Sequence, residues 1–263
     1  RLVDRSVAAL AAGVALGLYA LASAAGAPAV LAGLLAAGLG VPALGAALPA
    51  GTIRLRAGQP AAVAFICCAA VAYFSVDAFL PLSLTSVHGS SVAAAGLILS
   101  TGTVFWAAGT WLQARLITRV SPRPLLAGGA VTLAAGVGST GFVMTTAWVP
   151  FGLAAVSWAL VALGMGITSS TATLVVLNWA GPGSEGRASA AAQLANLLGG
   201  AAGTGLAGLK IASATDRPSL TTDVRLVALA AFGFALVTAV ASARARPAPA
   251  SPNPSDPKGV REG

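Results

Sequence analysis

Residues 61–84 read AAVAFICCAAVAYFSVDAFLPLSL, an almost unbroken apolar run that contains one acidic side chain, Asp77. Roughly 20 apolar residues, each rising about 1.5 Å along a helix, span the hydrocarbon core of a bilayer. The run is therefore long enough to cross a membrane as one helix. Stretches of similar length and composition flank it at 6–25, 29–49, 92–113, 125–146, 151–178, 187–209 and 224–243.

The composition excludes a soluble domain. Charged residues make up 8% of the chain and apolar residues 57%, whereas soluble domains carry about 25% charged residues. The apolar stretches are also too long and too uniform for the short alternating strands of a membrane β-barrel. Because backbone hydrogen bonds must be satisfied internally in lipid, the sequence predicts an all-α membrane protein, a polytopic transmembrane helix bundle of about eight spans.

The basic residues lie in the gaps between the spans. The net charge of +8 could suggest a nucleic-acid partner, but the bases are not gathered in one soluble segment, so none is expected. Twelve of the 15 lie in the terminal segments or in every second gap: Arg1, Arg5, Arg54, Arg56, Arg115, Arg119, Arg123, Arg187, Arg244, Arg246, Lys258 and Arg261. The other three share one gap: Lys210, Arg217 and Arg225. The positive-inside rule then predicts a multi-pass plasma-membrane protein with both termini in the cytoplasm.

The spans divide the chain into four parts. Residues 1–50 hold two transmembrane helices, and residues 51–60 form a basic cytoplasmic loop. Residues 61–243 hold six spans in two sets of three that enter the membrane from opposite sides. Such inverted sets make up one half of a large class of transporters. Residues 244–263 are rich in Pro, Ala and Ser, which predicts a disordered cytoplasmic tail.

Asp77 is the acid that lies inside a predicted span. An ionisable side chain at bilayer depth is by default a functional hypothesis. Pro81, four residues on, lacks the N–H that would bond the Asp77 carbonyl, so we expect a kink. Tyr73 lies one turn earlier on the same face. Because burial disfavours a charged carboxylate, we expect Asp77 and Tyr73 to serve proton coupling or substrate contact. The alternative is a permanently protonated or hydrogen-bonded acid that only packs.

Small and polar side chains form stripes at helical spacing in two spans. The stripe in 187–209 comprises Ser189, Gln193, Asn196, Gly200 and Gly203. It has two interpretations, a close helix interface or a substrate cavity lined by the amides of Gln193 and Asn196. The stripe in 92–113 comprises Gly96, Ser100, Thr103 and Ala107, and we expect it to pack against another helix.

Four further residues have ordinary and functional interpretations. Trp106, deep in its span, either stacks on a solute or packs in the core. His88 falls in an outer loop, where a surface role is expected. Cys67 and Cys68 are helical neighbours that point about 100° apart, so we expect small buried side chains and no disulfide. One His and two adjacent Cys supply no metal-ligand cluster, and no hydrolase or phosphate-loop motif occurs. We expect no enzyme activity, no metal and no cofactor.

Four segments together resemble the C-terminal half of major facilitator superfamily (MFS) transporters, above all the drug-efflux-like actinobacterial branch. These segments are Asp77-Ala-Phe-Leu-Pro-Leu, Gly109-Thr-Trp-Leu-Gln-Ala-Arg-Leu, Gly164-Met-Gly and Gly186-Arg-Ala-Ser-Ala-Ala-Ala-Gln-Leu. The first two spans are similar to the central pair of fourteen-helix members. The resemblance then implies that the six N-terminal helices of the transporter are a missing partner of this chain. A twelve-helix parent would assign these two spans to its fifth and sixth helices.

The chain departs from the family at one cytoplasmic motif. The family pattern G-x-x-x-D-R-x-G-R begins here at Gly109, and Gln113 stands in the place of the acid. An Asp-based charge relay is therefore not expected. The resemblance still implies a basic cytoplasmic gate loop made by Gln113, Arg115, Arg119 and Arg123.

The resemblance implies a secondary active transporter fragment that works by alternating access. We expect proton-coupled efflux of amphipathic or cationic small molecules, as in an antiporter, with Asp77 carrying the switchable charge. The solute would contact Tyr73, Trp106, Gln193 and Asn196. The alternative function is a non-catalytic integral membrane scaffold or assembly subunit, for which Asp77→Asn would leave transport unchanged.

Overall fold

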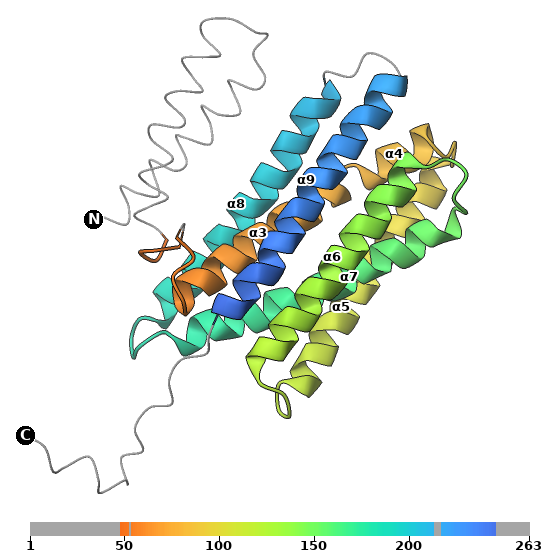
Figure 1. Cartoon of the computed structure of the whole chain (residues 1–263). Coiled ribbons are helices and arrows are strands. Elements are labelled where there is room, and N and C mark those ends of the chain that lie inside the picture. The colour runs from red at the N-terminus through yellow and green to blue at the C-terminus, as the bar shows by residue number, and fades with distance from the viewer. Residues whose placement is uncertain (1–47, 53, 213–216, 246–263) are drawn as a thin grey trace, which may run out of the picture.

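The computed structural model describes residues 48–52, 54–212 and 217–245. The predicted span 6–25, nearly all of 29–49 and the tail from residue 246 lie outside these residues. Within the described part every regular element is a helix and no strand occurs, as the composition predicted. The helices run side by side in a single bundle (Figure 1).

The described part of the chain contains seven helices. Their bounds are α3 Gln59–Asp77, α4 Leu80–Ser86, α5 Val92–Leu116, α6 Pro122–Thr145, α7 Gly152–Asn178, α8 Glu185–Ala212 and α9 Arg217–Arg244. The stretch 61–84, predicted as one kinked span, is two helices because α3 ends before Pro81. Helices α5, α6, α8 and α9 extend beyond their predicted spans at one or both ends, since polar residues can continue a helix outside the hydrocarbon core. Helix α7 begins one residue later than predicted and ends where predicted.

Five helical segments of the described part are long and apolar enough to cross a membrane. They are Gln59–Ser86, Val92–Leu116, Pro122–Thr145, Gly152–Asn178 and Thr221–Arg244. Helix α8 is as long, with 28 residues, but its glycines, amides and charged side chains lower its mean hydropathy. The chain is therefore a multi-pass membrane protein by length and composition of its helices.

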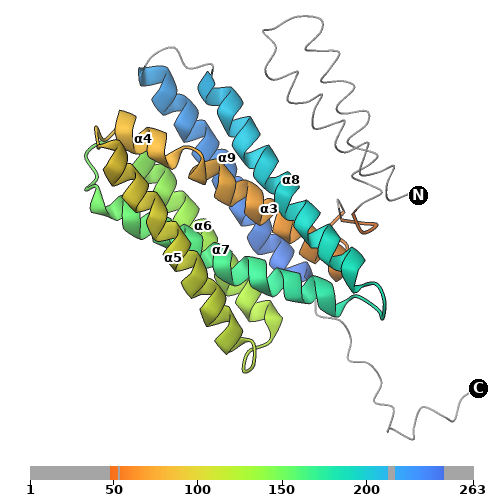
Figure 2. The same ribbon diagram turned by 180° about the vertical axis from the view of Figure 1, so that it is seen from behind.

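The first helix of each set of three packs against the two later helices of the other set. Helix α3, the first of one set, packs against α8 and α9, and α7, the first of the other set, packs against α5 and α6. Helices α3 and α7 also touch, as do α6 and α9. Figure 2 shows α3 beside α8 and α9, with α5, α6 and α7 grouped next to them. The largest helix contacts of α3 are therefore with helices of the other set.

Glycines allow the closest approaches at matching places in the two sets. A Cβ on Gly109 of α5 would overlap the Leu163 carbonyl oxygen of α7. In the same way, a Cβ on Gly199 of α8 would overlap the Cys67 carbonyl oxygen of α3. Small residues let membrane helices come within backbone contact, so these glycines set the spacing of α5 on α7 and of α8 on α3.

The small-residue stripe of α5 does not pack against the other described helices, contrary to our prediction. Gly96, Ser100, Thr103 and Ala107 are all exposed, and a Cβ on Gly96 would meet no atom within 4 Å. Helix α5 instead contacts α7 through its opposite face, which includes Gly102 and Gly109. The stripe is thus an open helix face of this bundle.

Candidate functional site

The predicted kink at Pro81 is a complete break between α3 and α4. Asp77 is the last residue of α3, and α4 begins at Leu80 with Pro81 in its first turn. The Phe79 N–H bonds the Val76 carbonyl at 3.1 Å. Because Pro81 has no N–H, the Asp77 carbonyl has no helical donor four residues on. The break therefore places a carboxyl group and a backbone carbonyl of one residue at the same point.

The Asp77 side chain is half-buried. Among the described residues, its carboxyl group makes no hydrogen bond and no ion pair. The adjacent Ala78 is exposed, so the break lies at an open face of the bundle. This arrangement does not match the alternative of an acid that is hydrogen-bonded within the described helices.

Tyr73, one turn before Asp77, joins a cluster of aromatic rings at the junction of α3, α5 and α7. Its ring centroid lies 5.0 Å from that of Trp106 at an interplanar angle of 85°. It lies 5.1 Å from the centroid of Trp158 at 35°, and 5.1 Å from that of Phe74 at 82°. Edge-to-face pairs of this kind are favourable, so the cluster fixes the Tyr73 ring beside the break.

Trp158 is a member of this cluster that sequence reasoning missed. The side chain is completely buried, and its indole Nε1 donates to the Leu99 carbonyl of α5 at 3.2 Å. The indole lies against Gly102, where a Cβ would overlap Nε1. A glycine on one helix and a tryptophan on another leave no local pattern in the sequence, because only the tertiary fold brings them together.

Trp106 is half-buried and therefore has both a packed and an open side. Its packed edge meets Tyr73, while its helical neighbours Thr103 and Ala107 are exposed. Core packing and solute contact are thus compatible for Trp106, because one part of the indole is packed and another part is exposed.

The stripe on α8 is divided between packing and exposure. Gly203 lies against α3, where a Cβ would be 2.7 Å from the Val71 carbonyl oxygen. Gly200 also faces α3, where a Cβ would be 3.1 Å from the Phe74 ring. Asn196 is half-buried and Gln193 is exposed. The small residues therefore serve the helix interface, whereas the amides lie at its edge. Phe74 connects this edge to the aromatic cluster.

Two residues assigned to the cytoplasmic gate loop lie instead within a helix. Gln113 and Arg115 belong to the last turns of α5, which continues to Leu116. Gln113 is buried, with 6% of its surface exposed, because it follows Gly109 on the face that packs against α7. The Arg115 guanidinium lies 4.0 Å from the Trp111 ring centroid. Arg119 and Arg123 are exposed in the connection to α6 and at its start.

His88 has a structural contact where a surface role was expected. It is half-buried, and its Nε2 lies 2.8 Å from the Val143 carbonyl oxygen of α6. Since a carbonyl only accepts, Nε2 must carry the proton of this bond. The Ser83 hydroxyl of α4 donates to the next carbonyl, that of Met144. Together these side chains attach α4 and the loop after it to the end of α6.

Cys67 and Cys68 are half-buried free thiols, as expected of helical neighbours. Within the described residues, no group of three or more His, Cys, Asp or Glu side chains could hold a metal ion.

A solved transporter shares the fold. The chain superposes on the crystal structure of a variant of the E. coli fucose:proton symporter FucP with a TM-score of 0.51 and 16% sequence identity. The match covers 81% of this chain and 54% of the symporter, so the chain spans about half the length of that transporter. The fold of this chain is therefore similar to that of this symporter. No protein-family model and no curated protein matches the sequence.

Proposed function

We propose that this chain is the C-terminal portion of a secondary active transporter that couples proton movement to efflux of amphipathic or cationic small molecules. The observation that carries the proposal is the Asp77 carboxyl group, half-buried at a helix break and without a hydrogen-bonding or charged partner among the described residues. Such a group can exchange a proton or a cationic solute as the bundle changes shape.

The neighbours of Asp77 support a cationic or aromatic solute. The half-buried rings of Trp106 and Phe74 both contact the ring of Tyr73. Aromatic faces attract cations, most strongly when water is excluded. A carboxylate one turn from such rings offers charge and apolar contact together, which is the chemistry that an amphipathic cation requires. Asn196, at the edge of the α3–α8 interface, would add an amide that can donate and accept.

The open faces of the bundle support a second half. The exposed stripe of α5 carries small residues suited to close helix contact, and the chain spans about half of the similar transporter. A second set of six helices packed there would enclose the space next to Asp77 and Trp106. Alternating access would then arise from the two halves rocking about this site.

The proposal is tested in inverted membrane vesicles from cells that express the complete gene product. With an imposed proton gradient, uptake of a lipophilic cation such as tetraphenylphosphonium should depend on Asp77. Asp77→Asn should abolish proton-driven accumulation while the protein keeps its abundance and its thermal midpoint. Glu185→Gln is the matched control because Glu185 is an exposed carboxylate at the start of α8, and it should transport normally.

A scaffold or assembly subunit remains the competing function, and the same experiment separates the two. If Asp77→Asn accumulates the cation as the unmodified protein does, the carboxyl group carries no coupling and the transporter proposal fails at this site. The isolated 263-residue chain should not transport when reconstituted, because it supplies only one side of the proposed cavity.

A further inference from the structure

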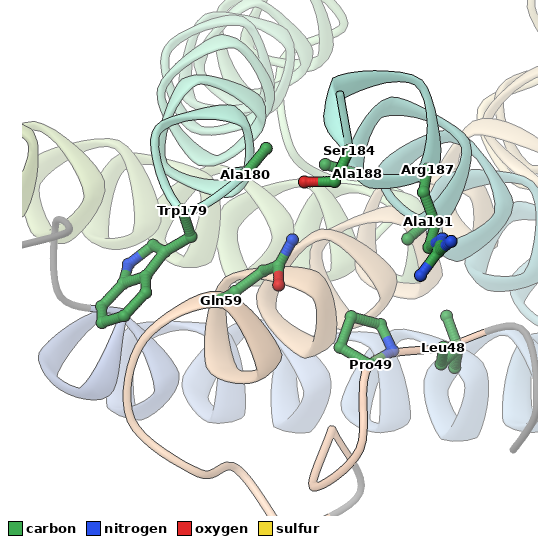
Figure 3. A pocket seen from close by; sticks show the side chains of 9 residues that line it. All are labelled: Leu48, Pro49, Gln59, Trp179, Ala180, Ser184, Arg187, Ala188 and Ala191. Carbon is green, nitrogen blue, oxygen red and sulfur yellow. The ribbon is translucent and has the colours of Figure 1, made fainter. Parts of the chain in front are cut away.

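A pocket separate from Asp77 lies at the opposite end of α3, where the helix begins. Its volume is about 340 Å³. Three parts of the chain line it, namely Leu48 and Pro49, the start of α3 at Gln59, and the segment from the end of α7 into α8 with Trp179, Ala180, Ser184, Arg187, Ala188 and Ala191. Figure 3 shows Gln59 projecting into the space between Ser184 and Arg187 on one side and Pro49 on the other.

The pocket has a polar part and an apolar part. Gln59, Ser184 and Arg187 supply amide, hydroxyl and guanidinium groups, whereas Leu48, Pro49 and the alanines of α8 supply an apolar wall. Gln59 Nε2 makes one long hydrogen bond of 3.5 Å to the Val176 carbonyl, so its second N–H is free to donate into the pocket. The Ser184 hydroxyl donates to the Gly181 carbonyl at 2.7 Å, which leaves its oxygen to accept.

Arg187 is the one charged side chain among the residues that line this pocket. It is exposed, and it makes no hydrogen bond or ion pair with any described residue. A guanidinium presents a planar fork of N–H donors that matches the oxygens of a phosphate. The positive charge of Arg187 therefore faces the pocket without an acidic side chain among the lining residues.

The position of the pocket points to the membrane surface. The start of α3 and the end of α9 meet here, because the Gly58 N–H donates to the Arg244 carbonyl at 3.0 Å. This end of the bundle also holds Arg54 and Arg56, Arg115 in the last turn of α5, and Arg119 in the connection to α6. The positive-inside rule assigns these residues to the cytoplasmic leaflet. Trp179, whose ring lies against Gly58, has the amphipathic character typical of a residue at that interface.

We propose that this pocket binds the head group of an anionic phospholipid of the cytoplasmic leaflet. The lipid phosphate contacts Arg187 and the Gln59 amide, and its glycerol backbone lies along the wall formed by Leu48, Ala188 and Ala191. A soluble phosphate would use only the polar part, whereas a phospholipid uses both. Basic pockets between helices at this depth are suited to such head groups. The site is independent of the proposed transport cycle.

Native mass spectrometry of the 263-residue chain in a neutral detergent tests the proposal. Phosphatidylglycerol should bind about fivefold more tightly than phosphatidylcholine, the preference expected for one arginine near an anionic lipid. Arg187→Gln should remove that preference. Arg119→Gln is the control because Arg119 is equally exposed at the same end but outside the pocket, and it should leave the preference unchanged.

A second variant and a soluble ligand complete the test. Gln59→Glu places a negative charge opposite Arg187 and should weaken phosphatidylglycerol binding, with helix content and thermal midpoint reporting that the fold is kept. Glycerol 3-phosphate should bind far more weakly than the lipid. The proposal is overturned if Arg187→Gln keeps the preference, if the two lipids bind equally, or if glycerol 3-phosphate binds as tightly as phosphatidylglycerol.

Discussion

The ring of Tyr73 on α3 meets the ring of Trp106 on α5 edge to face, with centroids 5.0 Å apart and planes at 85°. Helix α3 otherwise packs mainly on α7, α8 and α9. This ring pair therefore links α3 to α5 just before the break at Asp77. It also gives Trp106 a fixed orientation while part of the indole remains exposed.

Trp106→Leu should weaken the contact between α3 and α5 and lower the affinity for an aromatic cation. The aromatic pair contributes about 0.5–1.5 kcal/mol beyond its buried area, so the free energy of unfolding should fall by at least that amount in a detergent unfolding titration. The apparent affinity for tetraphenylphosphonium in vesicles should fall as well. Trp148→Leu is the control for the affinity, because Trp148 is 79% exposed and pairs with Phe142 at the end of α6 and not with Tyr73. An unchanged affinity in Trp106→Leu would remove Trp106 from the proposed solute site.

Gly109→Val should separate α5 from α7. A side chain at this position overlaps the Leu163 carbonyl oxygen and comes within 3.2 Å of the Gly166 Cα, and these backbone atoms cannot rotate away. Overpacking of this kind destabilises by about 1–3 kcal/mol. The matched control is Gly96→Val on the open face of the same helix, where a Cβ meets nothing within 4 Å. In the isolated chain Gly96→Val should unfold at the same detergent fraction as the parent sequence, and equal destabilisation by both variants would contradict the observed packing of α5.

Pro81→Ala should reduce transport with little effect on stability. Alanine restores an N–H that can bond the Asp77 carbonyl, and this bond stabilises the folded state by about 0.5–1.5 kcal/mol. Alanine also raises the conformational entropy of the unfolded chain, which offsets about 0.4–1 kcal/mol of that gain. The free energy of unfolding should therefore change by less than about 1 kcal/mol. The rate of cation accumulation should fall several-fold because α3 and α4 are then joined. Pro124→Ala, at an exposed position in the first turn of α6, should leave the rate unchanged.

Features with a local cause were predictable from the sequence. The length and composition of the apolar stretches predicted the long helices of the described part. The missing N–H of Pro81 predicted an interruption after Asp77. The stripe on α8 had two interpretations, a helix interface or a substrate cavity, and two of its residues, Gly200 and Gly203, lie against α3. Each of these depends on residues near one another in the chain.

Features that depend on partners distant in the sequence were not predictable. The burial of Trp158 against Gly102 requires α7 and α5 to meet. The burial of Gln113 follows from the same contact, and it moves that residue from the expected loop into a packed helix. The α5 stripe shows the converse, because helical spacing identifies a face suited to packing but not whether another helix of this bundle occupies it.

His88 and Ser83 should act together at the end of the bundle where α4 meets α6. Each bonds a backbone carbonyl near the end of α6, that of Val143 for His88 and that of Met144 for Ser83. Removing the Ser83 hydroxyl takes away the side-chain donor of the Met144 carbonyl, whereas the Val143 carbonyl keeps the Thr146 N–H at 3.2 Å when His88 is removed. Interhelical hydrogen bonds in membranes contribute about 0.6 kcal/mol on average. Ser83→Ala and His88→Ala should each destabilise by about 0.5–1.5 kcal/mol in a detergent unfolding titration.

The two effects should not add. Once one bond is lost, the segment that carries α4 can move from α6, so the second bond is already weakened when its donor is removed. A double-mutant cycle should therefore give a coupling free energy of about 0.5 kcal/mol or more, as found for residues that share one structural connection. His88→Gln keeps an N–H donor and should recover part of the stability lost in His88→Ala. Strict additivity, together with no recovery in His88→Gln, would mean that the two side chains do not attach α4 to α6 as a unit.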